Sequence, residues 1–182
     1  LRGQSAYCLD GQVFTVASAV RWLTDIGLIG APTDLDPLSA DGAGDVLCVP
    51  ALAGLAAPWW RGDARAVFTG IGLASTRGNL VTAVLQGIAA QIAELVSVVE
   101  ADTGEPLQLL RVDGGLTRSR ALMQAVADLC QVPIEVYASP HATALGAAAM
   151  GQLCLDPALT VPDALGHGGI SGSFVPLWDA AR

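Results

Sequence analysis

Apolar positions along the chain follow two spacings, one typical of helices and one of strands. Between Asn79 and Thr103 apolar residues recur every three or four positions, which predicts the longest helix, and Gly104 marks its end. Short apolar runs bounded by glycine, proline or aspartate predict buried strands. The expected helices cover 13–29, 79–103, a segment beginning at a Thr117 cap, and 142–154; the expected strands cover 7–9, 46–49, 66–71, 107–112 and 133–137. This alternation predicts an α/β fold.

The same pattern divides the chain into a core and a tail. Residues 33–45 are rich in Asp, Gly, Pro and Ser and predict a loop within the core. Beyond Asp156 the proline and glycine content rises. We therefore expect an ordered core over 1–155 and an irregular tail over 156–182.

Composition limits the classes of protein that fit. The 182 residues include 17 acidic and nine basic side chains, for a formal charge of −8, which disfavours nucleic acid and anionic membrane surfaces as partners. The most apolar long segment, 80–99, is interrupted by Gln86, Gln91 and Glu94, so a membrane span is not expected. Four isolated cysteines and two histidines form no metal-binding pattern. A cytoplasmic protein is the default expectation.

The most informative local feature is a predicted strand followed by Asp113, Gly114, Gly115 and a helix. Glycines at such a turn let a ligand approach the backbone, and free N–H groups at a helix N-terminus favour phosphate. Taken alone, the turn is more often a tight connection than a ligand site.

The surrounding blocks resemble the C-terminal domain of the FGGY family of carbohydrate kinases. The matching segments are V-D-G-G at 112–115, L-M-Q at 122–124, A-D at 127–128, V-P at 132–133, T-A-L-G-A-A at 143–148, a V-P-A…A-P-W-W block at 49–60, a second signature over 66–87, and a helix at 13–25. They occur in the family's order and span nearly the whole chain.

The resemblance implies an α/β fold of the actin-like ATPase (ribonuclease-H-like) type, the C-terminal half of a two-domain kinase. Residues 1–182 would be a partial nucleotide-binding domain whose first strand precedes Leu1. The implied reaction transfers the γ-phosphoryl group of MgATP to glycerol, giving glycerol 3-phosphate. The catalytic aspartate and the glycerol contacts belong to the family's N-terminal part. We therefore expect no catalytic residue here and no activity from this chain alone; family members often form dimers or tetramers.

Carrying over the family's nucleotide contacts gives five candidate cofactor-binding residues: Gly114, Gly115, Ser119, Ala17 and Arg21. Gly115 matches the family pattern. Ser119 replaces an asparagine, Ala17 a glycine and Arg21 a glutamine. Arg21 could bind a phosphate bidentately or could be an exposed helix arginine.

Two alternatives remain open for the function. One is a different FGGY substrate, a pentulose or a sugar alcohol. The other is a degenerate, non-catalytic module that kept the fold, which the changes at Ala17, Arg21 and Ser119 motivate.

Four further residues are weaker candidates: Trp59, Trp60, His141 and Asp113. We expect Trp59 and Trp60 to fill the core under a loop, although they could stack on a ligand. His141 is expected at the surface or at a helix cap. Asp113 could hold a ribose or a magnesium-bound water, or could cap the turn.

Overall fold

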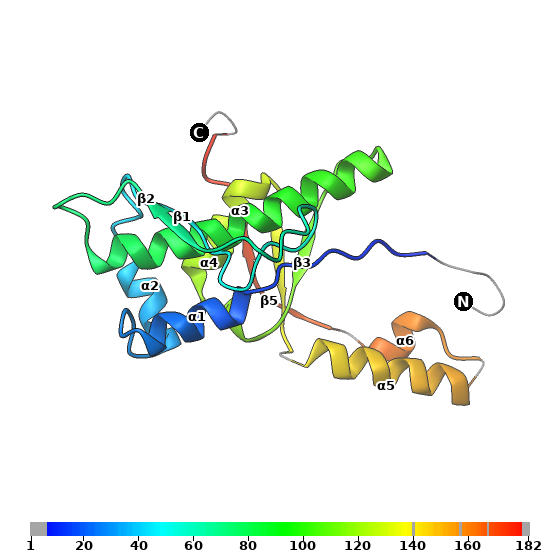
Figure 1. Cartoon of the computed structure of the whole chain (residues 1–182). Coiled ribbons are helices and arrows are strands. Elements are labelled where there is room, and N and C mark those ends of the chain that lie inside the picture. The colour runs from blue at the N-terminus through cyan, green and yellow to red at the C-terminus, as the bar shows by residue number, and fades with distance from the viewer. Residues whose placement is uncertain (1–6, 140, 157, 167, 180–182) are drawn as a thin grey trace. The chain divides into compact units, whose positions relative to one another are not determined.

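The computed structural model describes residues 7–139, 141–156, 158–166 and 168–179. The chain forms two compact units, residues 1–107 and 108–182, and the boundary falls inside the predicted core. Each unit has its own secondary structure and buried residues (Figure 1).

Helix α3 (Arg77–Thr103) forms the centre of the first unit, as the apolar spacing predicts (Figure 1). Thr76 caps its N-terminus: the Thr76 hydroxyl accepts a hydrogen bond from the Asn79 N–H, and Asn79 Oδ1 accepts one from the Thr76 N–H. Gly104, in the left-handed region at φ 73°, ends the helix. By length and composition α3 could cross a membrane, but 56% of its most apolar stretch is buried, as in the core helix of a soluble protein.

Two short strands pack beside this helix. β1 (Leu47–Val49) pairs antiparallel with β2 (Val67–Thr69), confirming both predicted strands. Only Cys48 of β1 is buried, so the prediction of a fully buried strand is wrong: the alternating pleat turns Leu47 and Val49 to the surface. The hydroxyl of Thr15, just before α1 (Val16–Asp25), donates to the Pro50 carbonyl and connects the segment after β1 to that helix.

The second unit is a small sheet with helices. β3 (Leu110–Val112) and β4 (Ile134–Tyr137) are parallel, and β5 (Ile170–Phe174) pairs antiparallel with β4. Between β3 and β4 lie η2 (Gly115–Arg118) and α4 (Arg120–Cys130). After β4 come α5 (Ala142–Leu155) and α6 (Val161–Leu165). The predicted strands over 107–112 and 133–137 and the helix over 142–154 are confirmed.

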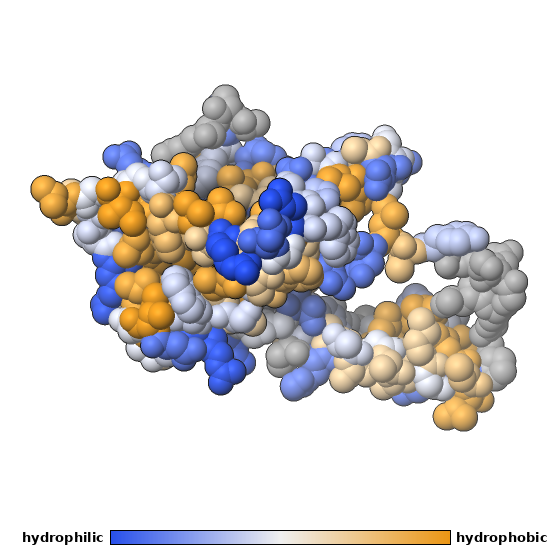
Figure 2. All heavy atoms as spheres, viewed as in Figure 1, coloured by the Kyte–Doolittle hydropathy of each residue, from blue (hydrophilic) through white to orange (hydrophobic). Residues whose placement is uncertain are grey.

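Helix α5 exposes an apolar surface. It consists mostly of alanine, leucine and glycine, and of its residues only Ala149 is buried. Its large exposed apolar side chains are Leu145, Met150 and Leu155. The space-filling view shows a largely apolar surface over this helix (Figure 2).

Four secondary-structure predictions are wrong. Residues 7–9 form no strand, and the helix expected over 13–29 is confined to Val16–Asp25. The segment expected as a loop over 33–45 begins with two short helices, η1 (Pro32–Asp34) and α2 (Leu35–Leu38). Burial of the Leu35 side chain stabilises this helical turn. The tail is not irregular, since α6 and β5 lie within it and the edge of β4 gives β5 its hydrogen-bonding partners.

Candidate functional site

The turn after β3 has an open backbone. Gly114 has φ 104° and ψ 175°, a conformation that side chains rarely adopt. A Cβ added at either Gly114 or Gly115 would meet no atom within 4 Å. Both glycines therefore leave their peptide groups accessible to a ligand, and only Gly114 is required by conformation.

Hydrogen bonds fix the shape of this turn. The Thr117 hydroxyl donates to the Gly114 carbonyl at 2.7 Å. The Ser119 hydroxyl accepts from the Leu122 N–H at 3.2 Å, and Ser119 is only 6% exposed. Ser119, and not the predicted Thr117, is thus the N-cap of α4, because η2 delays the helix start by two residues.

A cleft of about 470 Å³ adjoins the turn within the same unit. Its lining includes residues within the parallel strands β3 and β4 and at their carboxyl ends, the end at which α/β folds commonly bind ligands. Its walls combine polar and apolar side chains: Arg111, Asp113, Glu135, Tyr137, Leu145 and Ile170 are among them. Gly114 follows the lining residue Asp113 in sequence, but neither Gly114 nor Gly115 lines the cleft itself.

The charged side chains of the cleft differ in how they are held. Arg111 Nε donates to Glu135 Oε2 at 3.1 Å across the paired strands. Asp113 is exposed, and its carboxylate has no hydrogen-bond partner among the described residues. The turn-capping interpretation of Asp113 therefore has no support, and its carboxylate faces solvent at the cleft. Arg111 and Asp113 are two residues apart, and this spacing in an extended chain puts both side chains on the same side. The sequence therefore carries a signal that both belong to one site.

The other two predicted site residues lie on α1 in the first unit. Ala17 and Arg21 are four residues apart, so they occupy the same face of the helix, and both are exposed. The structure thus groups Gly114, Gly115 and Ser119 in one unit and Ala17 with Arg21 in the other.

The loop between β1 and β2 exposes two tryptophans. Trp59 is 41% exposed and Trp60 66%, so their prediction as core fillers is wrong. Trp60 has φ 52°, and this left-handed residue turns the chain outward after Pro58. The loop itself is tied by its own hydrogen bonds, and the indole surfaces are left for contact with a partner or with water.

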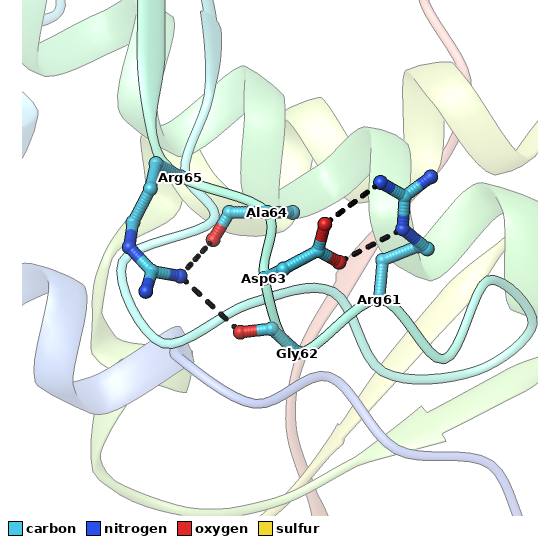
Figure 3. A network of polar contacts seen from close by, with 5 residues as sticks. All are labelled: Arg61, Gly62, Asp63, Ala64 and Arg65. Carbon is cyan, nitrogen blue, oxygen red and sulfur yellow. Dashed lines mark hydrogen bonds and ion pairs between the residues drawn. The ribbon is translucent and has the colours of Figure 1, made fainter.

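Charged side chains brace this loop (Figure 3). Arg61 Nε and Nη2 donate to the two carboxylate oxygens of Asp63, each at 2.9 Å, and Arg65 donates to the Gly62 and Ala64 carbonyls. The hydrogen bond from Arg61 lowers the pKa of Asp63 to about 2 and raises that of Arg61. Both side chains are exposed, so the pair shapes the loop and adds little stability.

Metal ligands are not gathered in the part of the chain that the structure describes. It contains no group of three or more His, Cys, Asp or Glu side chains that could hold a metal ion. His141 is exposed at the start of α5, confirming a surface position, and its side chain makes no capping bond. His167 lies outside the described residues. Asp34, in the Asp-containing segment 33–45, accepts hydrogen bonds from the Gly30 and Ala31 N–H groups.

Comparisons with known proteins agree on one family. Residues 2–153 match the model of the FGGY family of carbohydrate kinases, C-terminal domain. A glycerol kinase from Bordetella parapertussis is 40% identical over 179 residues, which is 97% of this chain and 35% of that protein. The chain therefore spans about a third of the length of the curated relatives it matches.

Solved structures support the same assignment. The crystal structure of Plasmodium falciparum glycerol kinase with ADP superposes with a TM-score of 0.82 at 33% identity, covering 93% of this chain and 34% of that one. Xylulose kinase from Rhodospirillum rubrum gives a TM-score of 0.75 at 30% identity, covering 93% of this chain and 35% of that one. Both likenesses fit the α/β fold of the actin-like ATPase type that the resemblance implies.

Proposed function

Because the chain belongs to the FGGY family of carbohydrate kinases, as the C-terminal domain, we propose that it is the nucleotide-binding part of a glycerol kinase. The complete enzyme would transfer the γ-phosphoryl group of ATP to glycerol and form glycerol 3-phosphate. The observation that carries this proposal is the open turn at Gly114 and Gly115, at the start of η2.

The turn suits a nucleotide for a physical reason. A phosphate or ribose needs close approach to backbone N–H groups, and no side chain covers either glycine. The partial positive charge at the start of α4 favours an anion in spite of the chain's net charge of −8. Ser119, as the cap, would hold this helix start in shape.

Arg21 of the first unit is a separate proposed contact to the nucleotide, carried over from the family resemblance. Its guanidinium is exposed on α1, and Ala17 on the same face adds only a methyl group. A planar guanidinium binds two phosphate oxygens at once, more strongly than the amide of a glutamine. We assign it to the phosphates of the nucleotide, with Ala17 as a neighbouring contact.

Magnesium would arrive with the nucleotide. Mg²⁺ keeps several waters and is usually held by substrate phosphates with one or two carboxylates. Asp113, whose exposed carboxylate has no described partner, suits a water of the hydrated ion. The ion would neutralise charge on the transferring phosphoryl group; the base that accepts the glycerol proton would come from another part of the enzyme.

A glycine substitution tests the nucleotide site directly. Gly115→Ala meets open space and requires no left-handed backbone, so the fold is expected to remain unchanged. The added methyl group would cover the proposed floor and weaken ADP binding about tenfold, measured by calorimetric titration of the full-length protein. Gly62→Ala, also in open space but on the β1–β2 loop, is the matched control. Equal ADP affinity in wild type and Gly115→Ala would contradict the proposed site.

A pentulose is the second candidate substrate. The similarity to a xylulose kinase, at 30% identity, is the observation that favours it. Comparing kcat/KM for glycerol and for D-xylulose in the full-length protein separates the two. A flat ADP titration of the wild-type protein would favour the degenerate, non-catalytic module.

A further inference from the structure

One face of α4 carries a row of side chains that contact the end of β5 and the segment after it. At intervals of three or four positions along the helix stand Arg120, Gln124, Asp128 and Gln131. Such spacing places them in one stripe, opposite the buried Leu122 and Val126. We name the segment Phe174–Trp178 the strap.

Contacts between the stripe and the strap run in order. The Arg120 guanidinium lies 5.5 Å from the centre of the Phe174 ring. Gln124 Nε2 donates to the Val175 carbonyl at 2.8 Å, and the Leu177 N–H donates to Asp128 Oδ1 at 2.6 Å. Gln131 Nε2, just beyond the helix, donates to the Trp178 carbonyl at 3.2 Å.

The dimensions of the two elements match. From position 120 to 131 a helix rises ~16 Å. Four extended residues, from 174 to 178, cover ~13 Å. The strap therefore lies nearly straight along α4, in the same direction, and successive strap residues meet successive turns of the helix.

Asp128 is the central group of this row. It is only 5% exposed, and its Oδ1 accepts hydrogen bonds from both the Leu177 N–H and Gln124 Nε2. A buried carboxylate is costly unless hydrogen-bonded, and these two donors satisfy it. The L-M-Q and A-D blocks of the sequence thus contribute Gln124 and Asp128 to a strap contact.

We propose that Asp128 and Gln124 are positioning residues for the nucleotide turn. The strap meets α4 from its first residue, Arg120, which directly follows the cap Ser119. The turn is joined to this helix start through η2, because Thr117 donates to the Gly114 carbonyl and the Ser119 N–H donates to the Leu116 carbonyl. A shift of α4 would therefore displace Gly114 and Gly115. Displacements of about 1 Å are enough to weaken a bound substrate's alignment strongly. The inference rests on the proposed nucleotide site.

Two substitutions at Asp128 in the full-length protein test this role. Asp128→Asn keeps Oδ1 as an acceptor for both donors, so ADP affinity and the KM for ATP should stay within about threefold of wild type. Asp128→Leu removes the acceptor and should raise the Kd for ADP and the KM for ATP about tenfold, with kcat at saturating ATP within about threefold of wild type. Amide hydrogen exchange at residues 175–178 and 114–119 should be faster than in wild type for Asp128→Leu and unchanged for Asp128→Asn.

Each outcome separates the inference from the proposed function. Faster exchange at the strap with unchanged ADP affinity in Asp128→Leu would show a stabilising role alone and overturn the inference. Equal losses in the Asn and Leu variants would also overturn it, since the charge and not the acceptor would then matter. If Asp128→Leu does not fold, Gln124→Met replaces it, with an expected threefold loss of ADP affinity; no loss contradicts the proposal. Absence of ADP binding by the wild type would instead refute the proposed function.

Discussion

The carbonyl oxygen of Cys48 in β1 lies where a side chain at Gly87 of α3 would have to be. A Cβ at Gly87 would overlap this oxygen and would stand 2.7 Å from Pro50 Cδ. The strand and the helix therefore approach backbone to backbone, which explains why Gly87 stands in the middle of the longest helix in spite of its low helix propensity.

Gly87→Ala should therefore destabilise the protein. Ordinarily alanine in a helix interior is favoured over glycine by up to about 1 kcal/mol. Here the overlap with β1 outweighs that gain, and we expect a net loss of about 1–3 kcal/mol. Urea unfolding followed by circular dichroism measures it. Gly151→Ala in α5, where a Cβ meets no atom within 4 Å, is the control and should be neutral or stabilising. Identical urea midpoints for the two variants would show that β1 can move away from α3 at no cost.

Periodicity predicts the longest helix of this chain and a strand of alternating burial. α3 follows from its apolar spacing and its glycine end, and β4 from the β-branched Ile134 and Val136, both buried. β5 escapes prediction because glycine and serine make up much of Ile170–Phe174, and it exists through pairing with β4. Such tertiary pairing leaves no signal in the local pattern.

The candidate site is predictable only where backbone conformation demands a residue type. Gly114 needs its left-handed φ, and the sequence marks it. Ser119 as a cap depends on the short η2 turn, which the sequence does not distinguish from the helix itself. Trp59 and Trp60 look like core residues by composition, but the hydrogen bonds of the 50–66 loop turn them outward.

Ser119 offers a test of the helix cap. Ser119→Ala leaves the Leu122 N–H without its acceptor and should cost about 1 kcal/mol of unfolding free energy. Ser119→Asn, the residue type that the family pattern has at this position, keeps a good cap and should restore most of the loss. Thermal unfolding of both variants measures the difference. Equal melting temperatures for wild type and Ser119→Ala would argue that another group satisfies the helix start.

Arg21 distinguishes a phosphate contact from a solvated helix side chain. If Arg21 binds the nucleotide, Arg21→Ala should weaken ADP affinity about three- to tenfold, with little change in stability because the side chain is exposed. Arg21→Gln keeps hydrogen-bond donors but loses the charge. Its ADP affinity should lie between those of the wild type and of Arg21→Ala. Isothermal titration at two salt concentrations provides the measurement, since the contribution of the charge decreases with ionic strength. Unchanged affinity in both variants would assign Arg21 to solvent.

The 182-residue chain alone should not phosphorylate glycerol. The proposed mechanism takes its base and its glycerol contacts from another part of the enzyme, and a nucleotide site alone cannot activate the hydroxyl group. A coupled assay for ADP release, with glycerol present and absent, checks this expectation. Glycerol-dependent turnover by the purified chain would mean that a base within these residues has been overlooked.

The thiol of Cys48 links the packing of β1 to pH. Burial raises the pKa of Cys48 from 9.0 to about 11, because the thiolate loses hydration in the folded state. A raised folded-state pKa means that stability is intact below pH 9 and is lost as the pH rises from about 9 to 11, by about 1–3 kcal/mol. Cys48→Ala should remove this part of the pH dependence when urea midpoints are compared at pH 8 and 10.5.

Alkylation at pH 7.5, read by mass spectrometry, should label the exposed Cys8 and Cys154 at once and Cys48 only after unfolding. Rapid labelling of Cys48 in the native protein would show that β1 opens from α3 far more readily than the close approach at Gly87 implies.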